Sequence, residues 1–163
     1  MDYLQHVFSL LSDEDYHLLD HEAYSFLPFL ITKMGDPKEP IKSSAKNIAN
    51  LICRIYPASK VSPYMIEGLK TKNARQRAEC LDGLGGLIET YGMSVCQPSP
   101  SVCLKEIAKQ ISDRDNSVRT SALNALVQVN SIIFWIENKI NIFILSSEET
   151  CKSMSNIFIN INQ

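Results

Sequence analysis

The sequence is poor in the features that mark fibrous, membrane-spanning or nucleic-acid-binding chains. Glycine occurs 6 times and proline 7 times in 163 residues, too rarely for collagen-like or low-complexity sequence. The net charge is −2, from 16 basic and 18 acidic residues, which argues against a nucleic-acid binder. No apolar run reaches the roughly 20 residues of a membrane span, so we expect no membrane association. The composition instead predicts one globular domain, or a fragment of a larger one.

Sequence signatures of catalysis and of cofactor binding are missing as well. The chain has no GxxxxGKS or GxxxxGKT loop, no GxGxxG, no HExxH and no GxSxG. We therefore predict that it is not an enzyme and uses no cofactor. Its 5 cysteines include no CxxC pair and lie far along the chain from the 3 histidines. This spacing favours buried free thiols in a reducing compartment over a disulfide framework or a metal site.

Three stretches, beginning at Gly35, Lys70 and Ser112, share one pattern. Each has a polar turn, then a cation, then a small residue three positions later, and apolar pairs with helical spacing precede each turn. The cation and small-residue pairs are Lys42 with Ala45, Arg77 with Cys80, and Arg119 with Ala122, spaced 35 and 42 residues apart. A repeat of this length built from helix pairs is typical of an α-solenoid, so the sequence predicts an all-α superhelix.

Capping and breaking residues give approximate bounds for the predicted helices. Pro40, Ser62-Pro63 and Asn73 indicate helix starts, and Gly92 indicates a stop. Three glycines within one predicted helix are expected to allow close helix–helix approach: Gly83, Gly85 and Gly86. The predicted helices cover residues 3–11, 20–34, 40–56, 62–70, 73–91, 102–111 and 116–130. The repeat pattern stops after residue 130, so we separate residues 1–130 from a divergent tail, 131–163, which is either helical or an aberrant terminus.

The predicted turns carry the most distinctive charge of the chain. The stretch from Lys70 to Arg77 has four cations and no acid. Equivalent turns of stacked helical hairpins lie along one edge, where a row of cations would suit an acidic protein surface. For Arg77 and Arg119 the alternative to partner binding is a structural role, because a basic residue and an aspartate often pair between neighbouring repeats.

The same segments resemble a known family. YPASK (56–60), QRAECLDGLGGLIETYGM (76–93), VCQPSP (95–100), LKEIA (104–108) and SDRDNSVR (112–119) resemble a TOG domain of the ch-TOG microtubule polymerases, closest to the fourth TOG domain of that array. The resemblance covers Tyr3 to Val129. It implies a partial TOG domain: a right-handed α-solenoid of about three and a half to four HEAT repeats, without the first repeat and half of the second. The turns at 35–40, 70–77 and 112–116 would then be the third, fourth and fifth of the tubulin-binding edge.

The resemblance also implies a function and a set of contact residues. The function is binding of αβ-tubulin or microtubules by a monomer in the cytoplasm, at microtubules, spindle poles and centrosomes, with other spindle or plus-end proteins as further partners. An alternative is a structural HEAT-repeat spacer that docks another regulatory protein. The implied tubulin-contacting residues are Lys38, Lys72, Asn73, Arg75, Arg77, Arg114, Asn116 and Arg119.

Overall fold

The computed structural model describes residues 2–131, and no strand occurs among them. The tail predicted from residue 131 lies, from residue 132 onward, outside the described residues. The elements are α1 (Asp2–Asp13), α2 (Asp20–Met34), α3 (Glu39–Ile55), α4 (Ala58–Gly68), α5 (Ala74–Tyr91), the short 3₁₀ helix η1 (Met93–Val95), α6 (Pro100–Lys109), the 3₁₀ helix η2 (Gln110–Ser112), and a last helix from residue 116 to the end of the described part.

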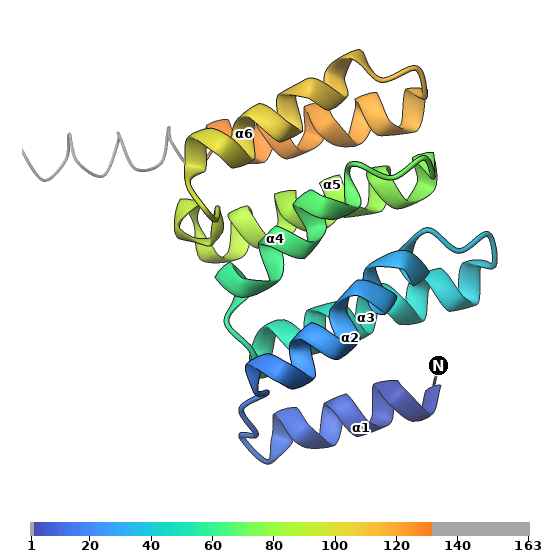
Figure 1. The fold of residues 1–163 in the computed structure, drawn as a ribbon, viewed down its shortest axis with the longest axis vertical. Coiled ribbons are helices and arrows are strands. Elements are labelled where there is room, and N and C mark those ends of the chain that lie inside the picture. Colours follow the sequence, from blue (N-terminus) through green and yellow to red (C-terminus); the bar gives the residue numbers. More distant parts are fainter. Residues whose placement is uncertain (1, 132–163) are drawn as a thin grey trace, which may run out of the picture. The chain divides into compact units, whose positions relative to one another are not determined.

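The helices form stacked antiparallel pairs, as the repeat pattern predicts. The pairs are α2 with α3, α4 with α5, and α6 with the last helix, and α1 packs against α3 outside these pairs (Figure 1). The connections within the pairs all lie at the right-hand edge in Figure 1, and the connections between pairs lie at the opposite edge. The predicted α-solenoid, with its three turns in one row, is therefore confirmed. We call this row, residues 35–38, 69–73 and 112–115, the turn edge.

The small residues of the repeat pattern occupy equivalent places in the core. Ala45, Cys80 and Ala122 are each fully buried, three positions after the cation of their repeat. Each lies six residues after the first residue of the second helix of its pair, where a larger side chain would hold neighbouring helices apart. Burial also raises the pKa of the Cys80 thiol to about 12. The cation is thus held close to the turn while the small residue anchors the helix to the stack.

Local sequence explains both ends of α5. The side chain of Asn73 accepts the backbone N–H groups of Arg75 and Gln76, at 3.1 and 3.5 Å, and begins α5. Gly92 ends α5 with φ 75°, a conformation that favours glycine. Both ends agree with the sequence prediction, as do the bounds of α2.

The predicted start of α4 at Ser62-Pro63 is wrong. The helix begins at Ala58, one turn earlier, and Pro63 lies inside it. A proline there cannot donate to the carbonyl of Ser59, four residues before. The hydroxyl of Ser62 has a single proton and two nearby acceptors, the carbonyl of Val95 at 2.5 Å and that of Ser59 at 3.3 Å, and the nearer acceptor is Val95. The helix therefore continues past Pro63 with only a long contact at the Ser59 carbonyl.

The three glycines of α5 differ in their surroundings. A Cβ on Gly85 would lie 3.2 Å from the Ala125 Cα and 2.0 Å from the Gln128 Oε1, so α5 and the last helix approach closely there. A Cβ on Gly86 would meet no atom within 4 Å. A Cβ on Gly83 would lie 3.0 Å from the Sδ of Met65 on α4. The expectation of close approach is therefore confirmed at Gly83 and Gly85 and wrong at Gly86.

Candidate functional site: the turn edge

Side-chain to backbone hydrogen bonds fix the shape of the turn edge. Asp36 accepts the backbone N–H of Lys38 at 2.9 Å, and Asp113 accepts that of Asp115 at 2.8 Å. The Nδ2 of Asn73 also reaches across to the neighbouring pair and donates to the carbonyl of Gly35 at 3.0 Å. The first and middle turns are therefore joined directly to each other.

Arg77 joins the middle turn to the third turn. Its Nε and Nη2 donate to the two carboxylate oxygens of Asp113, each at 3.0 Å, and its Nη1 donates to the carbonyl of Thr71 at 2.9 Å. The side chains of Arg77 and Asp113 are only 9% and 12% exposed. This bidentate geometry is the strongest that arginine makes with a carboxylate. The alternative expected for Arg77, pairing with an aspartate of the next repeat, is confirmed.

Hydrogen bonding to its ionised form lowers the pKa of the Asp113 carboxyl. The largest cause is the backbone N–H of Asp115, and the guanidinium of Arg77 acts in the same direction against the opposing effect of burial. Asp113 is therefore ionised in the folded chain at neutral pH, and the ion pair with Arg77 is complete.

Arg119 repeats part of this geometry one pair later. Its Nη1 donates to the carbonyl of Asp113 at 2.8 Å, and Arg77 likewise donates to a carbonyl six residues before itself. Further bonds run from Arg119 to the carbonyl of Arg114 and to the Oδ1 of Asn116, at 3.1 and 3.0 Å. Arg119 and Asn116 thus hold their own turn together.

The third repeat-equivalent cation, Lys42, makes a different set of contacts. Its Nζ lies 2.8 Å from a carboxylate oxygen of Glu39 and 3.3 Å from one of Glu79 on α5. The pKa of Lys42 is raised, chiefly by its hydrogen bond with Glu39. Position 71, which corresponds to Asp113, is a threonine, so Lys42 has no turn aspartate in the next repeat and pairs with a helix glutamate.

The remaining cations of the turn edge point into solvent. Lys70 forms an ion pair with Glu67 at 2.5 Å, so it adds little free charge. In the three turns and the first residues after them, four further cations are exposed. Their side chains make neither a hydrogen bond nor an ion pair within the described residues: Lys38, Lys72, Arg75 and Arg114.

The eight positions implied by the resemblance therefore fall into two groups. Asn73, Arg77, Asn116 and Arg119 have side chains that build and connect the turns, whereas the four exposed cations have charged ends open to a partner. The bond from Asn73 to Gly35 was not predicted, although an asparagine at a helix start was the available signal. No group of three or more potential metal-ligating side chains occurs in the described part of the chain, and none of its helices is long and apolar enough to cross a membrane.

Comparison with known proteins shows the family. The family model for the XMAP215/Dis1/CLASP TOG domain matches residues 4–146. The chain belongs to this TOG-domain family. It is 45% identical over 157 residues to the protein mini spindles of Drosophila melanogaster, 34% identical over 126 residues to the protein MOR1 of Arabidopsis thaliana, and 33% identical over 122 residues to zygote defective protein 9 of Caenorhabditis elegans. These matches cover 96%, 77% and 74% of this TOG chain, but only 7%, 6% and 8% of the relatives.

Solved structures agree with the family. One described as "TOG-tubulin binding specificity promotes microtubule dynamics and mitotic spindle formation" is 50% identical with a TM-score of 0.76, and the match covers 80% of this chain and 52% of that one. One described as "TOG domain structure from C.elegans Zyg9" is 30% identical with a TM-score of 0.73, and the match covers 80% and 48%. The TOG chain thus spans about half the length of these solved domains.

Proposed function

We propose that the chain is a non-enzymatic module of a longer microtubule-assembly protein, and that it binds αβ-tubulin through the turn edge. The observation that carries this proposal is the row of four exposed cations described above. In an otherwise acidic chain, positive side chains gathered on one edge favour an acidic protein partner. A related solved structure is described by its tubulin binding, which supports tubulin as that partner.

The proposed mechanism is docking by shape and charge, without covalent chemistry. Lys38, Lys72, Arg75 and Arg114 contact the acidic surface of tubulin. Exposed charges of this kind increase the association rate and fix orientation more than they increase affinity. Asn73, Arg77, Asn116 and Arg119 act indirectly, because their hydrogen bonds keep the three turns at fixed positions relative to one another.

The wider assignments follow from the family. We propose a location on microtubules and at the mitotic spindle, with spindle or plus-end proteins as further partners and a monomeric state. The position of the domain as the fourth of an array, and the division at residue 130, stay predictions.

A charge-reversal experiment tests the edge. The double variant Lys72→Glu and Arg75→Glu is compared with Arg54→Glu and Lys105→Glu, which changes the same charge at exposed positions away from the turns. Gel filtration and co-sedimentation with αβ-tubulin at low and high salt measure binding. We expect the edge variant to bind at least about tenfold more weakly, with a smaller salt dependence, and the control to stay within about twofold.

The same measurement distinguishes the alternative function. A HEAT-repeat spacer that docks another regulatory protein does not depend on the turn charges for tubulin. If adding Arg114→Glu to the edge variant still left tubulin binding unaltered, the assignment of the edge would be wrong and the spacer function would be favoured.

A further inference from the structure

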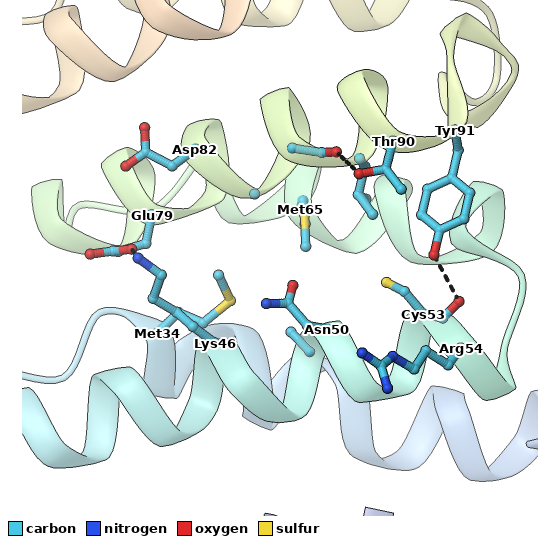
Figure 2. A pocket seen from close by; sticks show the side chains of 14 residues that line it. Met34, Lys46, Asn50, Cys53, Arg54, Met65, Glu79, Asp82, Thr90 and Tyr91 are labelled. Carbon is cyan, nitrogen blue, oxygen red and sulfur yellow. Dashed lines mark hydrogen bonds and ion pairs between the residues drawn. The ribbon is translucent and has the colours of Figure 1, made fainter. Parts of the chain in front are cut away.

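A groove separates two helices that are neighbours in the stack. The second helices of adjacent pairs, α3 and α5, enclose a hollow of about 530 Å³, while α2 packs against both α4 and α5 beneath it. Figure 2 shows the side chains of α3 along one wall and those of α5 along the other. The groove lies along the length of these helices, so its central part is distinct from the turn edge.

Polar contacts join the two walls at both ends of the groove. At the end near the turns, the Nζ of Lys46 lies 2.7 Å from a carboxylate oxygen of Glu79. At the other end, the hydroxyl of Tyr91 donates to the carbonyl of Cys53 at 3.3 Å. Between these two contacts Figure 2 marks no bond from one wall to the other; the bond from the Thr90 hydroxyl to the carbonyl of Gly86 lies within α5. The walls are therefore tied at the ends and left apart between them.

The middle of the groove has an apolar base, the amide of Asn50 on the α3 wall, and two positions without a side chain on the α5 wall. The buried side chains of Met34 and Met65 lie at its base, and Gly83 and Gly86 line the α5 wall. Glycine inside a helix lowers helix stability relative to alanine, so its presence calls for a structural reason. Gly86 has no atom within 4 Å of an added Cβ, so packing inside the chain does not require it.

Opposite charges stand on the two walls. Asp82 on α5 and Arg54 on α3 are both exposed, and among the described residues neither side chain has a hydrogen bond or an ion pair. Lys42 and Arg77 occupy equivalent positions of neighbouring repeats, 35 residues apart. By the same offset, Asp82 on α5 is equivalent to position 47 on α3, which lies seven residues before Arg54. Seven residues correspond to about 10 Å along a helix axis. The groove thus presents a negative charge nearer the turns and a positive charge about two helical turns further on.

We propose that this groove binds an amphipathic helix of a partner protein. An apolar side chain of that helix enters the hollow over Met34 and Met65, whose flexible thioethers adapt to its shape. A basic residue of the partner pairs with Asp82, and an acidic residue about seven positions away pairs with Arg54. Partner helices placed this way occupy a broad face of the stack and leave the exposed cations of the turn edge free.

Binding of a designed probe tests the proposal with the whole 163-residue chain. The probe is a fluorescein-labelled, alanine-based helix of about 15 residues with a lysine and a glutamate seven positions apart and leucines between them on the same face. Fluorescence anisotropy is expected to show saturable binding with a Kd of about 1–100 μM. Replacing Gly86 by leucine fills the hollow and is expected to weaken binding at least about tenfold, whereas Gly86→Ala, its matched control, stays within about threefold.

A charge exchange tests the orientation. Asp82→Lys is expected to weaken binding of the original probe about threefold or more, and to restore it for a probe whose lysine is replaced by glutamate. Circular dichroism checks that every variant is folded, and the Gly86 variants should gain helix stability because both new residues are better helix formers.

Each of the following results would overturn the proposal. The first is no binding of the probe by the wild-type chain up to about 1 mM. The second is equal binding by the Gly86→Leu variant and the wild type, or loss of binding on charge reversal of Lys72 and Arg75, which would place the probe on the turn edge. The third is a dimer in analytical ultracentrifugation that Gly86→Leu removes, which would assign the groove to a second copy of the chain.

Discussion

Removing the guanidinium of Arg77 should lower the free energy of unfolding far more than removing that of an exposed arginine. The substitution Arg77→Met keeps most of the apolar stem but removes three hydrogen bonds, two to Asp113 and one to the carbonyl of Thr71. Breaking one side of a fully buried ion pair costs about 3–5 kcal/mol. Since Asp113 is 12% exposed and keeps the N–H of Asp115, we expect a loss of about 2–3 kcal/mol.

Urea unfolding followed by circular dichroism measures this loss as a shift of the midpoint. In a chain of this size it corresponds to a fall in Tm of roughly 5–10 °C. Asp113→Asn, which keeps an oxygen for the N–H of Asp115, completes a double-mutant cycle with an expected coupling of about 1–2 kcal/mol. The matched control is Arg75→Met, two residues away and without a partner in the described part of the chain, which should change stability by less than about 0.5 kcal/mol. Equal effects of the Arg75 and Arg77 substitutions, or a coupling near zero, would refute the structural role of the pair.

Two further predictions concern pH and packing. The pKa of Asp113 is lowered in the folded state, so the unfolded chain binds the proton more readily. The contribution of Asp113 to the free energy of unfolding is therefore complete above about pH 4 and is lost as the pH falls further. Urea unfolding between about pH 2.5 and 6 should therefore show a smaller loss of stability in acid for Asp113→Asn than for the wild type, and equal slopes would contradict this. Gly85→Ala should lower the free energy of unfolding by about 1–3 kcal/mol, since the new Cβ meets Ala125. Gly86→Ala should raise it by about 1 kcal/mol, because alanine is the better helix former and its Cβ meets no atom. Thermal melts that rank the two variants in the other order would contradict this packing.

The repeat and most of the helix ends could be predicted from the sequence because they depend on local or periodic features. The cation and small-residue pairs mark equivalent positions, and the complete burial of Ala45, Cys80 and Ala122 shows why the small residue recurs. Capping by Asn73 and termination at Gly92 involve only neighbouring backbone groups. Pro63 could not be placed in this way, because the helix continues through it in a packed setting: the neighbouring Ser62 is fully buried and its hydroxyl donates to the carbonyl of Val95, 33 residues away.

The division of the turn cations into exposed and paired groups depends on tertiary structure. Arg75 and Arg77 are two residues apart, and about 200° of helix rotation places one in solvent and the other against the next repeat. The sequence offered both roles for Arg77 but could not choose between them. The groove between α3 and α5 was not predicted at all, because it arises from the packing of α2 against α5 and not from any local pattern.

The bond between Arg77 and Asp113 makes the geometry of one turn depend on the repeat that follows it. A shortened chain ending before α6 would keep every residue of the middle turn and yet leave the Arg77 guanidinium without its carboxylate. Under the proposed function, such a fragment is expected to bind tubulin more weakly although all its exposed cations are unchanged. Deletion experiments on this domain should therefore end at least one full helix pair beyond the turn whose contacts they are meant to map.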